Sequence, residues 1–199
     1  MNEQYGIKPA PERVAIAGAG GIGTWVAVGL VHAGTSRIEV FDPDRVERSN
    51  LNRLPYSEQA IGMSKVEALS QFIDRMERSV DFIGYSVPFT PAMLGEAAIN
   101  LTVVDCTDNL TAQKEIFDWC RQRWHQYWRV GSNGNHITIA RTMPGWLDDE
   151  PQPPARRCGV TVPQFLHTQF IAAGVAVAKI CAANPDVQNK IVSKEVLSI

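Results

Sequence analysis

Cysteine is scarce in this sequence of 199 residues, which contains four cysteines and no Cys-x-x-Cys pair. The four are Cys106, Cys120, Cys158 and Cys181. A structural zinc site needs thiolate ligands in close pairs, so this spacing predicts no zinc. So few cysteines in a chain of this length also argue against a disulfide framework, because stapled domains are small and rich in cysteine. We therefore expect free thiols.

Long apolar runs and a surplus of one charge are also missing. The most apolar stretch, residues 170–183, is short and contains Lys179, so it cannot span a bilayer. Residues 1–13 contain no apolar signal-peptide core. The 19 basic and 21 acidic residues give a net charge of −2, which does not favour binding to nucleic acid through bulk charge. The sequence therefore predicts a cytoplasmic protein that does not enter a membrane.

Short apolar runs alternate with amphipathic stretches along the chain. The expected strands cover residues 14–17, 37–41, 80–87, 101–106, 127–131 and 136–141. The expected helices cover residues 22–32, 65–76, 91–100, 109–126 and 163–183. Strands that alternate with helices predict an α/β fold, with a doubly wound, mostly parallel Rossmann-like sheet and helices on both faces. Its ligand crevice should lie at the carboxyl ends of the strands.

The length of the chain suits one domain spanning residues 1–199. We expect residues 1–12 to form an N-terminal extension and residues 184–199 to form a tail. Proline is concentrated in residues 142–162, which we expect to form a mobile crossover segment before the final helix.

The glycine-rich segment Gly18-Ala-Gly-Gly-Ile-Gly23 joins the first expected strand to the first expected helix. Its glycines allow a tight turn and a close approach of the backbone to a ligand, and the helix N-terminus presents amides to phosphate. Asp42 follows the second strand, where a carboxylate can accept hydrogen bonds from ribose hydroxyls. These features predict a nucleotide-binding domain, but a dehydrogenase would have them as well.

Two basic side chains follow that the binding of a dinucleotide does not require. Arg53 lies beyond the second strand, and Lys65 begins the next helix. A triphosphate uses such cations, because negative charge develops on its β and γ groups as pyrophosphate leaves. Asp108 follows the strand at 101–106, where its carboxylate can hold Mg²⁺ or orient the attacking group. The combination favours a nucleoside triphosphate over NAD.

Four segments together resemble the ThiF/MoeB/HesA superfamily of ubiquitin-activating-enzyme-like adenylyltransferases. They are GAGGIG at 18–23, FDPDRVERSNLNR at 41–53, IGMSK at 61–65 and DCTDN at 105–109. The resemblance covers residues 13–183 and implies a single, compact adenylation domain without the zinc cysteines of other members. It also implies that Mg²⁺-ATP is used to adenylate the C-terminal carboxylate of a ubiquitin-like or sulfur-carrier-like protein, with release of pyrophosphate.

The same resemblance implies which residues bind the nucleotide. They are Gly18, Gly20, Gly21, Gly23, Asp42, Ser49, Asn50, Arg53, Lys65, Asp108 and Asn109. By this resemblance Asp42 holds the ribose, and Arg53 and Lys65 contact the phosphates. Asp108 ligates Mg²⁺ and, with Asn109, serves the reacting carboxylate. Arg53, Lys65 and Asp108 are therefore the expected catalytic residues of adenylation.

Cys158 differs from the other cysteines in its setting. Cys106, Cys120 and Cys181 fall in expected strands and helices, where a cysteine behaves as a small hydrophobe. Cys158 follows the proline-rich segment, and the adjacent Arg156 and Arg157 favour its thiolate. In the family that the sequence resembles, a thioester cysteine often precedes the last apolar helix. We expect a thioester on Cys158, with a ubiquitin-conjugating-like enzyme as a candidate recipient; an ordinary loop cysteine is the alternative.

Other interpretations remain open at this stage. The resemblance implies a homodimer, yet Lys8 and Arg13 are the only basic residues near the N-terminus that could serve a partner's site. The acceptor could instead be a tRNA base, a peptide or a small molecule, without a thioester. An NAD-dependent oxidoreductase and a non-catalytic binding subunit are further alternatives. Residues 121–129 mix basic and aromatic side chains, as single-stranded nucleic-acid surfaces do, but we expect these aromatics to pack inward.

Overall fold

A single twisted sheet organises the protein in a computed structural model, which describes residues 10–94, 100–133, 136–142 and 165–182. Its strands are β1 (Arg13–Ala17), β2 (Arg37–Phe41), β3 (Asp81–Tyr85), β4 (Thr102–Asp105), β5 (Gln126–Asn133) and β6 (His136–Ala140). They lie in the order β3-β2-β1-β4-β5-β6. Neighbouring strands run parallel, except that β6 is antiparallel to β5. The predicted doubly wound, mostly parallel sheet is confirmed.

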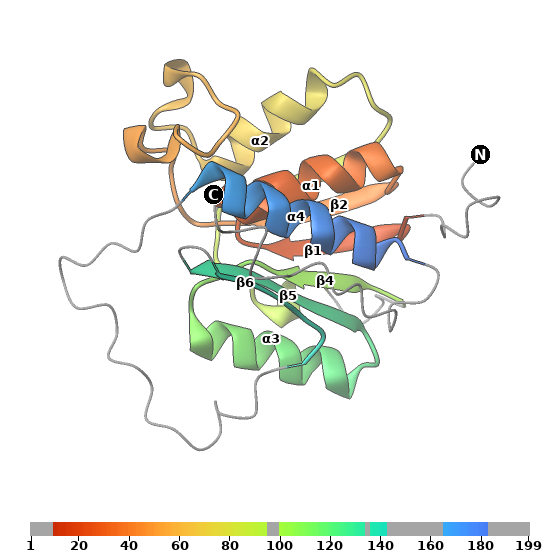
Figure 1. The fold of residues 1–199 in the computed structure, drawn as a ribbon. Coiled ribbons are helices and arrows are strands. Elements are labelled where there is room, and N and C mark those ends of the chain that lie inside the picture. The colour runs from red at the N-terminus through yellow and green to blue at the C-terminus, as the bar shows by residue number, and fades with distance from the viewer. Residues whose placement is uncertain (1–9, 95–99, 134–135, 143–164, 183–199) are drawn as a thin grey trace.

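Helices cover both faces of this sheet, as predicted (Figure 1). The helices are α1 (Gly21–Ala33), α2 (Lys65–Asp74), α3 (Leu110–Gln122) and α4 (Leu166–Ile180). Helices α1, α2 and α4 lie on one side and α3 on the other. Three short 3-10 turns, η2 (Arg48–Asn50), η3 (Glu58–Ala60) and η4 (Pro91–Leu94), complete the described elements. Among the described helices, none is both long and apolar enough to cross a membrane.

The core has two layers because successive side chains of a strand point to opposite faces. Val14 and Ile16 of β1 pack beneath α1 and α4, in a cluster that also contains Leu30. Ala15 and Ala17, the alternate residues, face the α3 side. Both sets are fully buried, which is why β1 reads as a continuous apolar run rather than an alternating one.

Local signals in the sequence set the ends of two helices. Ser64 caps α2 by accepting a hydrogen bond from the Glu67 backbone N–H at 3.2 Å. Gly34 ends α1 in the left-handed conformation, with φ of 91°, and its N–H bonds the Leu30 and Val31 carbonyls. These caps satisfy backbone groups that would otherwise lack partners at the helix ends.

Other boundaries differ from the prediction. Helix α3 ends at Gln122 instead of about residue 126, because Trp124 takes a left-handed φ of 60° and Gln126 already begins β5, where it pairs with Thr102 of β4. The expected strand over 80–87 is the shorter β3. The expected helix over 91–100 is described only as the 3-10 turn η4. The final helix, expected from residue 163, is described from Leu166 onward.

The basic and aromatic run at 121–129 contributes mainly to the core. Tyr127 and Trp128 are buried in the two layers of the sheet. Trp124, in contrast, is 92% exposed, so the prediction that these aromatics pack inward is right for two and wrong for one. With Tyr127 and Trp128 buried, the run does not present the continuous aromatic platform that single-stranded nucleic acid requires.

Candidate functional site

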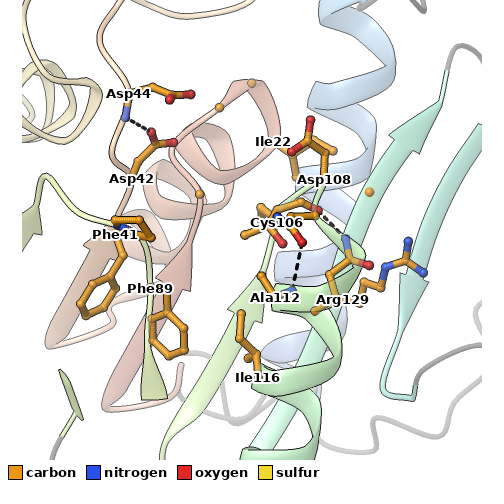
Figure 2. Close-up of a pocket in the computed structure, with 18 of the residues that line it drawn as sticks. Ile22, Phe41, Asp42, Asp44, Phe89, Cys106, Asp108, Ala112, Ile116 and Arg129 are labelled. Carbon is orange, nitrogen blue, oxygen red and sulfur yellow. Dashed lines mark hydrogen bonds between the residues drawn. The ribbon is translucent and has the colours of Figure 1, made fainter. Parts of the chain in front are cut away.

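A cavity of about 710 Å³ opens where the carboxyl ends of the strands converge. It sits between β1 and β4, the point at which the chain switches from building one half of the sheet to the other. This is where open α/β sheets bind ligands. Figure 2 shows Asp42 at one side of the view, Arg129 at the other, and Asp108 between them. Eight of the predicted site residues line it: Gly18, Gly20, Gly21, Asp42, Arg53, Lys65, Asp108 and Asn109.

The glycine turn forms the floor of the cavity. Gly18 has φ of 95°, and a Cβ there would lie 3.1 Å from the Cys106 carbonyl oxygen. A Cβ on Gly23 would lie 1.8 Å from the Gly18 carbonyl oxygen, so Gly23 permits the turn itself and does not line the cavity. Gly20 borders open space and caps α1 without any side-chain hydrogen bond in the described structure. The first amides of α1 therefore form a cradle that suits a phosphate.

Asp42 is held rigidly beside this turn. Its Oδ2 accepts the Ala19 N–H at 2.7 Å, and its Oδ1 accepts the Asp44 N–H at 2.8 Å. The side chain is nearly buried, and this burial raises the pKa of Asp42, although nearby Lys65 and the two amides oppose the shift. Each carboxylate oxygen still has a second lone pair with which to accept from a ribose hydroxyl.

Two cations reach the cavity from different elements. Lys65 begins α2, and its Nζ lies 2.7 Å from Asp44 Oδ2 and 3.9 Å from Asp42 Oδ1. Arg53 follows the η2 turn, where one terminal N–H group donates to the Ser49 carbonyl at 2.8 Å. The Arg53 carbonyl accepts from the indole of Trp25 at 3.0 Å, which anchors this segment to α1. The structure thus brings together two basic residues that are separated in the sequence.

Ser49 and Asn50 precede Arg53 in the chain and, unlike Arg53, do not line the cavity. Ser49 Oγ donates to Glu47, and Asn50 Oδ1 accepts the Glu47 backbone N–H at 3.2 Å. These bonds stabilise the η2 turn that carries Arg53. Their direct contact with phosphate stays a prediction.

The segment after β4 supplies the acidic side of the cavity. Asp108 is exposed at its edge, and Asn109 caps α3 by accepting the Ala112 N–H at 3.1 Å. Asp105 lies beneath them, fully buried, and accepts from the Thr107 backbone N–H, the Thr107 hydroxyl and the Tyr127 hydroxyl. Burial raises the pKa of Asp105 despite these three hydrogen bonds.

The donor set fits magnesium. Within the described residues, no three His, Cys, Asp or Glu side chains gather in a way that could hold a metal ion. Mg²⁺ is usually bound by one or two carboxylates together with substrate phosphates and water. A single carboxylate such as Asp108, facing a cradle for phosphate, is therefore sufficient for it.

Three of the four cysteines are poor nucleophiles in this structure. Burial raises the pKa of the Cys120 thiol to about 12 and also raises the pKa values of Cys106 and Cys181. Cys106 lines the cavity, but burial and the neighbouring Asp105 both disfavour its thiolate. Cys158 lies outside the described residues, together with Arg156 and Arg157.

Several polar residues that the sequence did not single out also line the cavity, among them Gln113 on α3, Arg129 on β5 and Gln169 on α4. Gln169 packs against Gly21, where a Cβ would lie 1.5 Å from its Oε1. The need for glycine at that position was the one available signal. Arg129 is the register partner of Asp105, which only the pairing of β4 with β5 reveals.

The strand order, the glycine turn and the polar cavity at the switch point define a nucleotide-binding α/β domain of the Rossmann type. Within that class, the chain belongs to the ThiF family, whose family model matches residues 3–185.

Curated relatives agree with this assignment. The chain is 28% identical over 138 residues to ubiquitin-like modifier-activating enzyme 5 of Bombyx mori, which covers 63% of this chain and 35% of that protein. It is 32% identical over 110 residues to adenylyltransferase and sulfurtransferase MOCS3 of Aedes aegypti, which covers 54% of this chain and 25% of that protein. The chain thus spans well under half of the length of either relative.

Solved structures share the fold. E. coli MccB superposes with a TM-score of 0.72 at 19% identity, over 89% of this chain and 56% of that chain. E. coli TcdA, a tRNA N6-threonylcarbamoyladenosine dehydratase, superposes with a TM-score of 0.58 at 23% identity, over 65% of this chain and 56% of that chain. At these identities the likeness concerns the fold alone.

Proposed function

We propose that this protein is an adenylyltransferase that uses Mg²⁺-ATP to activate the C-terminal carboxylate of a ubiquitin-like or sulfur-carrier-like protein. The observation that carries the proposal is the meeting of Asp42, Arg53, Lys65 and Asp108 in one cavity at the N-terminus of α1. The names of two curated relatives, an activating enzyme of a ubiquitin-like modifier and an adenylyltransferase, support the same activity.

The proposed reaction assigns a task to each side chain. A carboxylate oxygen of the acceptor attacks the α-phosphorus, the bond from that phosphorus to the bridging oxygen breaks, and pyrophosphate leaves with the electron pair. Asp42 holds the ribose, while Arg53 and Lys65 stabilise the charge that builds on the departing phosphates. Mg²⁺, held at Asp108, would neutralise phosphate charge. The amides at the start of α1 fix the phosphates in place.

A thioester on Cys158 would follow adenylation. The thiolate attacks the acyl carbon of the adenylate, and AMP leaves with the electrons of the broken bond. The proposal draws support from the other three thiols, whose raised pKa values make them poor nucleophiles. A ubiquitin-conjugating-like enzyme would then receive the acyl group.

We also propose that the protein works in the cytoplasm as a homodimer and binds no zinc. Arg13 does not support the idea of an arginine supplied to a partner's site. It lies at the start of β1, away from the cavity, and its Nε donates to Glu39 at 2.6 Å. Lys8 lies outside the described residues.

A competing function keeps adenylation and changes the acceptor to a tRNA base, a peptide or a small molecule. The observation that favours it is the fold likeness to E. coli TcdA, whose name refers to a modified tRNA base. This alternative needs no thioester. An NAD-dependent oxidoreductase is disfavoured because Arg53 and Lys65 both reach the cavity.

The first test compares thermal unfolding with Mg²⁺-ATP and with NAD. A ligand present at a hundred times its dissociation constant adds about 2.7 kcal/mol to the free energy of unfolding. We expect Mg²⁺-ATP to stabilise the wild type and to lose most of this effect in Asp108→Ala. Glu115→Ala, exposed on α3, is the matched control and should behave as wild type. Stabilisation by NAD alone would contradict the proposal.

The second test measures exchange of radiolabelled pyrophosphate into ATP with purified ubiquitin-like and sulfur-carrier proteins. Asp108→Ala should lose exchange by a hundredfold or more, since it removes a group that acts on the phosphates (about 3 kcal/mol). Cys158→Ala should keep exchange but lose any adduct that a thiol reductant releases. An adduct that persists in Cys158→Ala would remove this cysteine from the mechanism.

A further inference from the structure

The cavity continues beyond the residues assigned to the nucleotide. On the side of β5 and β6 it is lined by Arg129, Gly131 and Ser132 of β5 and by Thr138 of β6, and Gln113 of α3 adds to it. Gly131 and Thr138 are register partners across the antiparallel pair. A Cβ placed on Gly131 would meet nothing within 4 Å, so this wall leaves room for a ligand.

Gln113 presents an acceptor that the described protein does not use. The side chain is only 2% exposed, and its Nε2 donates to the Thr107 carbonyl at 2.6 Å. That hydrogen bond fixes the amide plane. Its Oε1 is buried and finds no hydrogen-bond partner among the described residues. Buried acceptors are rarely left unpaired, because the loss costs about 1–3 kcal/mol. The arrangement favours a ligand that brings an N–H group.

Arg129 presents the complementary feature, a cation whose charge lowers the pKa of the neighbouring Asp105 but which makes no close ion pair with it. It sits opposite Asp105 in the register of β4 and β5. The Asp105 oxygens already accept from Thr107 and from the Tyr127 hydroxyl. In the described part of the chain Arg129 forms no ion pair within 4.0 Å, and its buried Nε has no hydrogen-bond partner. A planar guanidinium in this state suits a carboxylate, which it can bind through two parallel hydrogen bonds.

We propose that Arg129 and Gln113 bind the last residue of the acceptor chain. Arg129 pairs with the terminal carboxylate, and Gln113 Oε1 accepts from the last peptide N–H. The inference rests on the proposed function, because it places the acceptor on the side of Asp108 away from Asp42. Figure 2 shows this order, with Arg129 on the β5 side of the cavity and Asp42 on the β2 side. Arg129 and Gln113 are thereby binding residues that position the nucleophile.

The ligand class follows from the pairing of an acceptor with a cation. A C-terminal residue offers an N–H and a carboxylate separated by one carbon. Phosphate offers no N–H, so it would leave Gln113 unpaired. The amino group of adenine could bond to Gln113 but would leave Arg129 unused. A peptide carboxylate satisfies both groups at once, and the open space beside Gly131 leaves room for the chain that carries it.

The test uses three small probes whose binding is followed by protein-observed NMR. N-acetyl-glycylglycine carries both groups, its C-terminal amide lacks the carboxylate charge, and the depsipeptide N-acetyl-glycyl-glycolate replaces the last N–H by an ester oxygen. With the wild type we expect the amide to bind at least tenfold more weakly than the dipeptide, and the depsipeptide roughly fivefold more weakly. Equal affinity for all three probes, or no binding of the dipeptide, would overturn the inference.

Protein variants complete the cycle. Arg129→Gln should remove the preference for carboxylate over amide, and Gln113→Met should remove the preference for peptide over depsipeptide. Arg123→Gln is the matched control, because Arg123 lies over the Trp119 ring at the end of α3 and does not line the cavity. It should keep both preferences. The probe series on the wild type decides the matter even if a variant fails to fold.

Calorimetric binding of Mg²⁺-ATP separates this inference from the proposed function. Both variants should bind Mg²⁺-ATP within about twofold of wild type. If they weaken Mg²⁺-ATP and leave the dipeptide unchanged, the pair belongs to the nucleotide site and the inference is wrong. If neither the wild type nor the variants bind Mg²⁺-ATP, while the wild type still prefers the dipeptide over the amide and the depsipeptide, the proposed function fails and the carboxylate site stands.

Discussion

Lys65 Nζ donates to Asp44 Oδ2 across 2.7 Å, which ties the cation proposed for phosphate to a carboxylate at the edge of the cavity. The side chain of Asp44 is 64% exposed, whereas that of Lys65 is 13% exposed. A phosphate that binds Lys65 therefore competes with Asp44 for the same ammonium group. Because an exposed carboxylate gains little from such a pair, it can be displaced.

Asp44→Asn should strengthen the binding of Mg²⁺-ATP. The change releases Lys65 and removes one negative charge near the phosphates, so we expect the dissociation constant to fall roughly two- to fivefold. Isothermal titration calorimetry at fixed ionic strength measures it. Glu58→Gln is the matched control, since it breaks the exposed pair with Arg48 outside the cavity. An unchanged or larger dissociation constant in Asp44→Asn would show that the pair does not compete with phosphate.

Gly20 and Gly23 should separate ligand binding from folding. A Cβ on Gly23 would overlap the Gly18 carbonyl oxygen, while a Cβ on Gly20 would meet nothing within 4 Å. Gly23→Ala should lower the free energy of unfolding by about 1–3 kcal/mol in urea titrations. Gly20→Ala should leave this free energy nearly unchanged and weaken Mg²⁺-ATP, because its methyl group enters the space beside the α1 amides. Equal destabilisation by both would contradict the description of the turn.

Asp105 should make stability depend on pH in a definite direction. Burial raises its pKa above the ordinary value of 3.8, so between the two values the folded state holds more protons than the unfolded state. Stability from this group is therefore full below 3.8 and is lost as the pH rises through the folded pKa. Asp105→Asn does not titrate.

Urea titrations from about pH 4 to pH 7 measure this effect. The free energy of unfolding of wild type, minus that of Asp105→Asn, should decrease as the pH rises. Tyr127→Phe removes a hydrogen bond that lowers the pKa of Asp105, so it should steepen the decline relative to wild type. A difference that increases with pH would mean that burial does not dominate at this carboxylate.

Alkylation should distinguish Cys158 from the other cysteines. Raised pKa values leave Cys106, Cys120 and Cys181 almost entirely protonated at neutral pH, and thiols react as thiolates. With iodoacetamide at about pH 7.5, peptide mass mapping of the native protein should find Cys158 modified first. In urea all four cysteines should be labelled equally, which controls for the reagent's access to each thiol. If Cys106, Cys120 or Cys181 were modified before Cys158, the argument for Cys158 as the nucleophile would be lost.

The parts of the site that depend on local chemistry were predictable. Gly18 and Gly23 mark the turn because no other residue fits there, and Asp42 follows from the end of a strand. Ser64 and Gly34 set helix ends through bonds to residues within one turn. Each of these features needs only neighbours in the sequence, so the sequence carries its signal.

The parts that depend on register were not predictable. Arg129 lines the cavity because β5 pairs with β4 so that Arg129 lies opposite Asp105. The sequence of β5 alone is equally compatible with a pairing shifted by one residue, which would turn the Arg129 side chain to the other face of the sheet. Gln113 looks like one polar residue among several on an amphipathic helix, although it is buried. The predicted end of α3 is wrong for a related reason, because pairing of Gln126 with Thr102 of β4 overrides helix propensity.

The packing of α4 on α1 has a consequence for synthesis of the chain. Gly21 and Gly29 of α1 lie against Gln169 and Val177 of α4, so the first helix is shaped to receive the last described one. A ribosome releases α1 long before α4 has been made, and α1 meanwhile exposes an apolar face to water and to other chains. The glycine turn can therefore acquire the wall that α4 supplies only after the ribosome has made that helix, so the cavity cannot be complete before then.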